Sequence, residues 1–302
     1  TSVTNITGTA AAINTLMGNE GDSGNKINLD GDFTVTVDAG SVAAAHLNTI
    51  NAKTTGLVTA TAATTITGTA AAINTLIGNE GDSGDKVNLD ADYDITVNSG
   101  TASVSLANTF AAATGGTVTA EITETDAATL ATLNETTNAY TITVGDTSVT
   151  AARLIAIDGA TTVNVTATAV TTISGAAADL NTVLTAGGIT GLGAEAVTVT
   201  DSAVTAAVLN TLNGNTTGLV TATGVTAITG TIAQINTLVG NEGDSGDKVN
   251  LDTDYTATIT DTSTTAALLN TVNGNVPGLV TATSVTTISG TAAAINTLMA
   301  IS

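Results

Sequence analysis

The sequence predicts an α/β solenoid, a right-handed stack of about eleven coils, each made of a parallel strand, or two short strands, and a short helix. Two observations predict it. The phrase GTAAAINTL occurs at 8–16, 68–76 and 290–298, and stretches in which valine alternates with threonine recur between such phrases. A coil of this kind cannot bury its apolar face alone, but the coils above and below can cover it.

The asparagine of each phrase measures the repeat. Related phrases place an asparagine at ten such positions, and Ile155 stands at an eleventh. Successive positions are separated by 34, 26, 34, 26, 21, 26, 29, 26, 34 and 26 residues, so coils of 26 residues alternate with coils of 21–34 residues. We therefore expect residues 1–302 to form one continuous repeat array with no separate domains. At about 4.8 Å per stacked strand, eleven coils would make a rod of roughly 50 Å.

These asparagines are expected to form a structural ladder, in which each side chain hydrogen-bonds backbone at the corner between helix and loop. The alternative is a solvated asparagine at the end of each helix. The ladder residues are Asn14, Asn48, Asn74, Asn108, Asn134, Asn181, Asn210, Asn236, Asn270 and Asn296.

The alternating stretches predict half-buried strands, because apolar residues and β-branched threonines recur with a period of two. They lie at 58–61, 165–168, 197–200, 220–223 and 280–283. A second short strand is expected in places such as 64–67.

The alanine-rich phrases predict the helices, in which Ile13, Leu16 and Met17 recur at i, i+3 and i+4. Threonine or serine just before each helix is expected to cap it. Gly18, like Gly78 and Gly240, is expected to close its helix in the left-handed conformation.

An aromatic residue locates the variable part of each long coil. In the three 34-residue intervals it lies 19 residues after the asparagine, and in the 21-residue interval it lies 6 residues after. Length variation therefore falls in one loop between asparagine and aromatic, as is typical of solenoids. We expect the aromatics to fill the groove beneath this loop: Phe33, Tyr93, Tyr140 and Tyr255.

Composition excludes several classes of function. Five basic residues against 26 acidic ones give a net charge of -21, which argues against nucleic acid as a partner. The absence of cysteine and the single His46 leave no thiolate chemistry and no zinc cluster. No nucleophile-elbow, Walker or dinucleotide motif is present, so the chain is expected not to be an enzyme. The sequence contains no run of about 20 apolar residues, so membrane insertion is not expected.

Three acidic loops, at 19–32, 79–92 and 241–254, are the sharpest candidate site. Clustered Asp, Asn and Gly could supply the six to eight oxygen ligands that calcium takes, although neither an EF-hand nor a glycine-rich nonapeptide is present. The alternative is a solvated turn with an internal ion pair, because each loop also contains a lysine. Calcium is the one cofactor considered. The candidate ligands are Glu20, Asp22, Asp30, Asp32, Glu80, Asp82, Asp85, Asp90, Asp92, Glu242, Asp244, Asp247, Asp252 and Asp254.

The threonines of the strands suggest a second hypothesis. Stacked strands would place them in rows about 7 Å apart along a strand and 4.8 Å apart between strands, which could mimic an ice lattice. The alternative is that threonine occupies these positions because it is β-branched and polar on a wet face.

Phrases such as 138–144 (NAYTITV), 165–174 (VTATAVTTIS) and 189–193 (ITGLG) resemble tandem repeats of very large secreted surface proteins from cyanobacteria and other aquatic bacteria. The resemblance covers essentially the whole chain and implies an extracellular stalk, adhesin or filament. Such proteins often carry hemolysin-type calcium repeats nearby, which this sequence lacks.

Residues 1–17 nearly match 283–299, which predicts continuation into a longer array or head-to-tail stacking of chains. The sequence thus predicts a structural or adhesive repeat protein that forms a rod or filament on a bacterial surface. A cysteine-free, acidic composition fits that extracellular location. The alternatives are a calcium- or ice-binding adhesin segment and a phage fibre shaft, which would assemble from three chains.

Overall fold

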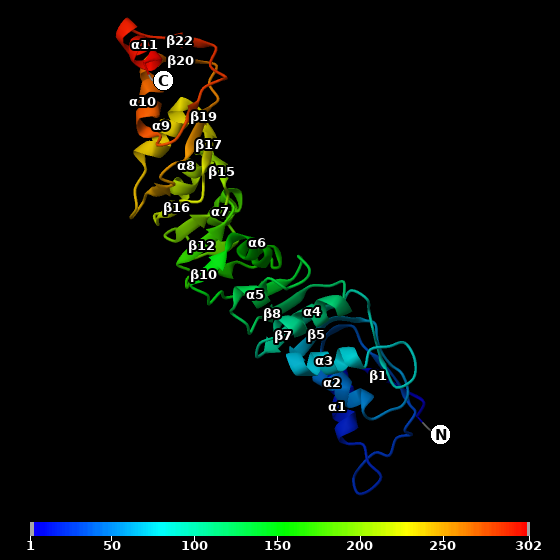
Figure 1. Ribbon diagram of the computed structural model, residues 1–302. Coiled ribbons are helices and arrows are strands. Elements are labelled where there is room, and N and C mark those ends of the chain that lie inside the picture. Colours follow the sequence, from blue (N-terminus) through cyan, green and yellow to red (C-terminus); the bar gives the residue numbers. More distant parts are fainter. Residues whose placement is uncertain (1–2, 301–302) are drawn as a thin grey trace. The chain divides into compact units, whose positions relative to one another are not determined.

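The computed structural model describes residues 3–300, which form an α/β structure with parallel strands and eleven short helices (Figure 1). The chain divides into two compact units. Unit 1 comprises Thr1–Thr143 with Ile157–Val165, and unit 2 comprises Val144–Ala156 with Thr166–Ser302. Helix α6 (Ala151–Gly159) has residues in both. The α/β class is confirmed, whereas one continuous array over residues 1–302 stays a prediction.

Unit 1 contains two parallel sheets. The first has the order β1 (Asn5–Gly8), β2 (Thr34–Val37), β4 (Val58–Ala60) and β6 (Val87–Leu89). The second has the order β3 (Gly40–Ala43), β5 (Ala63–Thr69), β7 (Asp94–Ser99), β8 (Val118–Glu121) and β9 (Ala139–Thr141). The helices are α1 (Ala10–Gly18), α2 (Ala44–Asn51), α3 (Ala70–Gly78), α4 (Val104–Ala113) and α5 (Ala127–Leu130).

Unit 2 repeats this plan. One sheet has the order β10 (Ser148–Thr150), β12 (Thr172–Gly175), β14 (Ala196–Val199), β16 (Val220–Ala222) and β18 (Val249–Leu251). Another has the order β15 (Ala203–Thr205), β17 (Ala227–Gly230), β19 (Thr256–Ile259) and β21 (Val280–Thr281). Two pairs are β11 (Val165–Thr166) with β13 (Ile189–Thr190), and β20 (Ser263–Thr265) with β22 (Thr287–Ser289). The helices are α7 (Ala177–Leu184), α8 (Ala206–Asn215), α9 (Ile232–Gly240), α10 (Ala266–Asn275) and α11 (Ala292–Met299).

The core lies between consecutive coils. In unit 1, Val35 pairs with Val58 and Val58 with Val87, and all three side chains are fully buried. The neighbouring Thr36 pairs with Thr59 on the more exposed face. Period-two alternation therefore separates an apolar column from a threonine column, as the sequence predicts. The same separation recurs in unit 2 around Val197, Val220 and Val249.

Successive helices pack on one another within each unit, from α1 to α4 and from α7 to α11 (Figure 1). All of them except α11, which has no buried residue, turn one narrow apolar face inward. In α2 this face is Leu47 and Ile50, and in α8 it is Leu209 and Leu212, all with no exposed surface. The many small residues let the helices approach closely, so a chain with few aromatics still builds a dry core.

Threonine and serine caps begin most of the helices, as predicted. The Thr9 hydroxyl oxygen accepts a hydrogen bond of 3.2 Å from the Ala12 N–H, and α3, α4, α8, α9, α10 and α11 have equivalent caps. Three helices also receive a carboxylate from the following coil at their first N–H. Glu124 caps α4 at 2.9 Å, Asp201 caps α7 at 2.7 Å and Asp261 caps α9 at 2.8 Å. Negative charge is favourable there because it faces the positive end of the helix dipole.

The predicted glycine closures are wrong. Gly18, Gly78 and Gly240 are the last residues of their helices, and none of them has a positive φ. The capping residue that follows each of these three helices is an asparagine, such as Asn19 with φ -97°, whose N–H bonds back to the Leu16 carbonyl at 2.9 Å. The left-handed residue lies five positions further on, at Gly24 with φ 73° and its two counterparts. The chain reverses inside the loop, so the helix end needs no left-handed residue.

The acidic segments are also more than projecting loops. Residues 82–85 are exposed, but Val87–Leu89 form β6 and Val249–Leu251 form β18, with Val87 and Val249 fully buried. The second half of each of these segments is therefore part of a sheet. The aromatics that follow are buried as expected, since Phe33, Tyr93, Tyr140 and Tyr255 are at most 2% exposed.

Candidate functional site

The asparagine positions connect neighbouring coils through the middle of the helices. Four side chains donate from Nδ2 to a backbone carbonyl 24 residues later, at distances of 2.8–3.0 Å. The bonds are Asn48 to Ala72, Asn108 to Thr132, Asn210 to Gln234 and Asn270 to Ala294. Each of these asparagines opens a 26-residue interval, so this bond gives a physical reason for the constant coil length.

The remaining asparagine positions differ. Asn181 donates to the Val208 carbonyl over a longer 3.3 Å. Asn74, Asn134 and Asn296 are exposed, and Asn14 and Asn236 are half-buried. The acceptor carbonyls of Ala72, Gln234 and Ala294 lie within helices, whereas that of Thr132 lies in the turn just after α5, at the corner that the sequence analysis expects. The bond therefore alternates between coils instead of recurring in every one.

A buried threonine, which the sequence analysis missed, also joins consecutive coils. The Thr216 hydroxyl donates to the Glu195 carbonyl at 2.6 Å and accepts from the Gly218 N–H at 3.0 Å. The same pair of bonds is formed by Thr54, Thr114 and Thr161. Each hydroxyl donates to a carbonyl 21 residues earlier and accepts from the N–H two residues later. The recurring Thr-x-Gly before three of the strands is the signal that could have revealed it.

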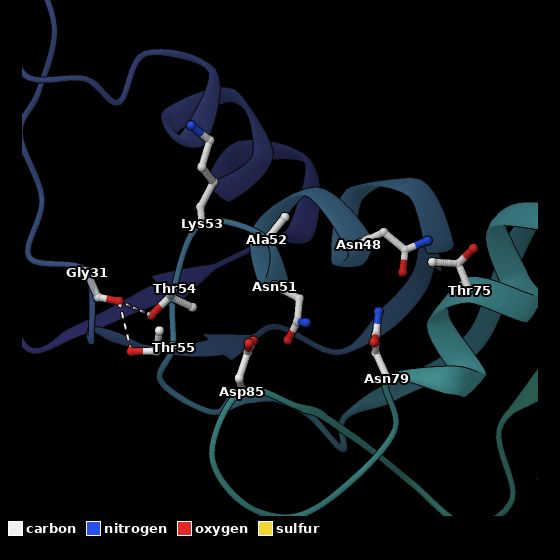
Figure 2. Close-up of a pocket in the computed structure, with 10 residues that line it drawn as sticks. All are labelled: Gly31, Asn48, Asn51, Ala52, Lys53, Thr54, Thr55, Thr75, Asn79 and Asp85. Carbon is white, nitrogen blue, oxygen red and sulfur yellow. Dashed lines mark hydrogen bonds between the residues drawn. The ribbon is translucent and has the colours of Figure 1, made fainter.

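A cavity of about 480 Å³ lies in unit 1 where α2 ends. We call it the α2 pocket. Its lining residues are Gly31, Asn48, Asn51, Ala52, Lys53, Thr54, Thr55, Thr75, Asn79 and Asp85 (Figure 2). Asn51 is only 8% exposed, and the Oδ1 atoms of Asn48 and Asn51 are buried without a hydrogen-bond partner. Figure 2 shows the Asn51 side chain pointing between Asp85 and Asn79. Of the predicted metal ligands, only Asp85 lines this pocket.

Backbone bonds close the first half of each acidic segment. The Gly81 N–H bonds to the Val87 carbonyl and the Val87 N–H to the Asn79 carbonyl, both at 3.0 Å, and the other two copies match. Lysine stems cover the glycine of the turn, and Lys26 Nζ donates to the Gly18 carbonyl at 2.8 Å. The lysine stems therefore pack on their own loops, as in a solvated turn, but within residues 3–300 no lysine of these loops forms the internal ion pair that this alternative expects.

The glutamates of these segments have different partners. Glu20 Oε2 lies 3.0 Å from Lys53 Nζ, whereas Glu80 Oε2 accepts from the Tyr93 hydroxyl at 3.5 Å. Burial raises the pKa of Glu80, and the Tyr93 hydrogen bond opposes that rise. Burial, and then the nearby Glu80 charge, raises the pKa of Tyr93. The equivalent Tyr255 has its pKa raised to about 12, mainly by burial and also by Glu242.

The remaining predicted ligands lie after the sheet strands or at the loop tips. Asp90 and Asp92 line a second cavity of about 310 Å³ with Asp94. In the third acidic segment, the side chains of Asp252 and Asp254 hydrogen-bond to each other. This bond lowers the pKa of Asp252 and raises the pKa of Asp254. Asp22, Asp30, Asp32, Asp82 and Asp244 are exposed. Across residues 3–300, no three acidic, histidine or cysteine side chains gather to hold a metal ion. Calcium binding stays a prediction.

The expectation that the chain is not an enzyme stays a prediction. His46 is half-buried on α2, and Arg153 lies on α6. The threonine columns are short, for example Thr229, Thr258 and Thr281 in register across β17, β19 and β21. Ice binding stays a prediction. No helix between residues 3 and 300 has the length and apolar character needed to span a membrane.

Comparison with known proteins adds no relative. No family model matches the sequence, and neither a curated protein nor a solved structure is significantly similar to it.

Proposed function

We propose that the chain is a right-handed α/β solenoid that serves as an extracellular structural and adhesive repeat on a bacterial surface. One observation carries this proposal. Within each unit, the apolar strand columns are covered by strands of neighbouring coils, and consecutive helices from α1 to α4 and from α7 to α11 pack on one another. Stability of this kind depends on nearest neighbours, so coils can be added to extend the molecule without redesigning a core.

Two kinds of bond between coils support a mechanical role. The asparagine amide joins helix to helix, and the buried threonine joins strand edge to the preceding coil. Both recur in unit 1 and unit 2. Bonds repeated in every second coil resist separation of the coils along the stack, which suits a spacer or stalk.

The surface supports an extracellular, soluble array. A net charge of -21 would keep such arrays apart and resist lateral clumping. The exposed acidic loops would then be what the stalk displays. The alternating threonines on the wet face keep that surface polar without adding charge.

Small-angle scattering and negative-stain imaging of the purified chain test the proposal. We expect thin particles of roughly 50 Å per chain, from about 4.8 Å per coil, either single or joined end to end. Sedimentation equilibrium separates this from the fibre-shaft alternative, which requires three chains side by side. Compact particles, or a trimer, would overturn the proposal.

A further inference from the structure

Four side chains that line the α2 pocket already use their hydrogen-bond donors. The hydroxyl groups of Thr54, Thr55 and Thr75 all donate to backbone carbonyls, and Thr75 reaches the Ala71 carbonyl at 3.0 Å. Nδ2 of Asn48 donates to the Ala72 carbonyl at 2.8 Å. These groups present lone pairs to the cavity rather than protons.

The buried lining atoms that lack a hydrogen-bond partner are acceptors. Oδ1 of Asn51, a side chain more than nine-tenths buried, has no partner, and neither does Oδ1 of Asn48. The Asp85 carboxylate faces the same space (Figure 2). A buried amide oxygen without a hydrogen-bond donor destabilises the folded state. A ligand that donates hydrogen bonds to these oxygens would therefore stabilise it.

The charge of the pocket matches a single positive charge. Asp85 is the one carboxylate among the lining residues. Lys53 lies at the rim, points away from the cavity in Figure 2, and has its ammonium 3.0 Å from Glu20. A cavity of about 480 Å³ is far larger than a bare metal ion needs, but it can hold an alkyl chain.

We propose that the α2 pocket binds a primary ammonium group carried on an alkyl chain, with Asn48, Asn51 and Asp85 as its acceptors. Three N–H donors of the ammonium meet three oxygens, one of them charged. The ligand is a free alkylamine or the lysine side chain of another protein, since both present this chemistry.

Unit 2 carries the same residues 162 positions later. Asn210, Asn213 and Asp247 correspond to Asn48, Asn51 and Asp85, and Oδ1 of both asparagines is again buried without a partner. The position that corresponds to Lys53 is Asn215. The lysine at the rim is therefore not part of the repeated group of two asparagines and one aspartate. We assign the same ligand to this second set.

Nitrogen–proton NMR spectra of the full chain provide the test, because the side-chain amides of Asn51 and Asn213 report each set separately. Pentylamine and Nα-acetyl-lysine methylamide, which each carry one ammonium group, are the probes for the two sources, and the Nε-acetylated lysine derivative is the uncharged control. We expect the amide signals to shift with either probe and to stay fixed with the control. A tighter response to the lysine derivative identifies a protein partner, and a tighter response to pentylamine identifies a free amine.

Substitutions locate the effect. Asp85→Asn should weaken binding in unit 1 about tenfold, which is the loss of about one charge-assisted hydrogen bond. Asp82→Asn, which removes the same charge from the same loop outside the pocket, should leave it unchanged. Both positions are exposed, so neither change threatens folding. Asn51→Leu, followed at the side-chain amide of Asn48 in the same pocket, should abolish the shift.

Three results would overturn the proposal: no shift at Asn51 with either amine at about 50 mM, equal shifts with the acetylated control, or shifts with calcium chloride alone. The site lies within one unit, so these outcomes are independent of whether the chain forms a rod.

Discussion

Gly218 tests the idea that close contact between coils dictates this fold. It follows the buried Thr216 and precedes β16, and a Cβ there would stand 2.7 Å from the Ala196 N and closer still to the Glu195 carbonyl. Ordinary contact begins at about 3.4 Å, so relief of the Ala196 contact alone requires a movement of about 0.7 Å, and relief of the closer Glu195 contact requires more. Overpacking of this size costs about 1–3 kcal/mol, and loss of the two Thr216 hydrogen bonds adds about 1 kcal/mol each. Gly218→Ala should therefore destabilise unit 2 by about 3–5 kcal/mol.

Urea unfolding with residue-resolved hydrogen exchange at Val197 and Val220 measures this loss, since these residues pair across the disturbed contact. Gly214→Ala is the matched control. Gly214 lies in α8 with nothing within 4 Å of an added Cβ, so this change should be neutral or stabilise by up to about 1 kcal/mol. If Gly218→Ala unfolded within about 0.5 kcal/mol of the unaltered chain, tight contact between coils would not be what requires glycine here.

Three further changes probe other contacts. Thr216→Val should cost about 2 kcal/mol in urea unfolding because it strips two buried hydrogen bonds, and an unchanged midpoint would contradict the interpretation. Asn108→Ala loses bonds of 2.9 and 2.8 Å to the next coil and should cost about 2 kcal/mol, whereas Asn74→Ala, exposed at the same repeat position, should be neutral. Burial raises the pKa of Glu80, so the folded state binds more protons than the unfolded state between the ordinary and raised values, and stability falls as pH rises through that window. Glu80→Gln should then unfold at higher urea than the unaltered chain at pH 7 and at the same urea near pH 3, and a lower midpoint at pH 7 would refute the sign.

Local patterns of sequence predict the elements well. Alternation of valine with threonine identifies β4, β14, β16 and β21, because a strand with one buried face needs that period and little else. Threonine before an alanine-rich phrase identifies the helix starts, because the cap involves residues only three apart. The helix ends were not predictable in this way. The chain reverses at Gly24 rather than Gly18 because backbone hydrogen bonds between residues 19 and 27 close the loop. A pattern of adjacent residues does not predict such bonds.

The candidate site shows the same division. Composition and repeats predict acidic, oxygen-rich segments, but they group the carboxylates by nearness in sequence. The fold separates them, because Val87–Leu89 enters a sheet and leaves Asp85 on one side and Asp90 on the other.

The sequence by itself determined the repeat, the alternation of coil lengths, and the strands and helices, since each depends on residues within a few positions of one another. Only the tertiary structure decided which side chains meet. Asn51 and Asp85 come from different coils and share a cavity because stacking brings the end of one helix over the loop of the next. Stacking also leaves the two amide oxygens without donors, a feature of packing that no linear pattern contains.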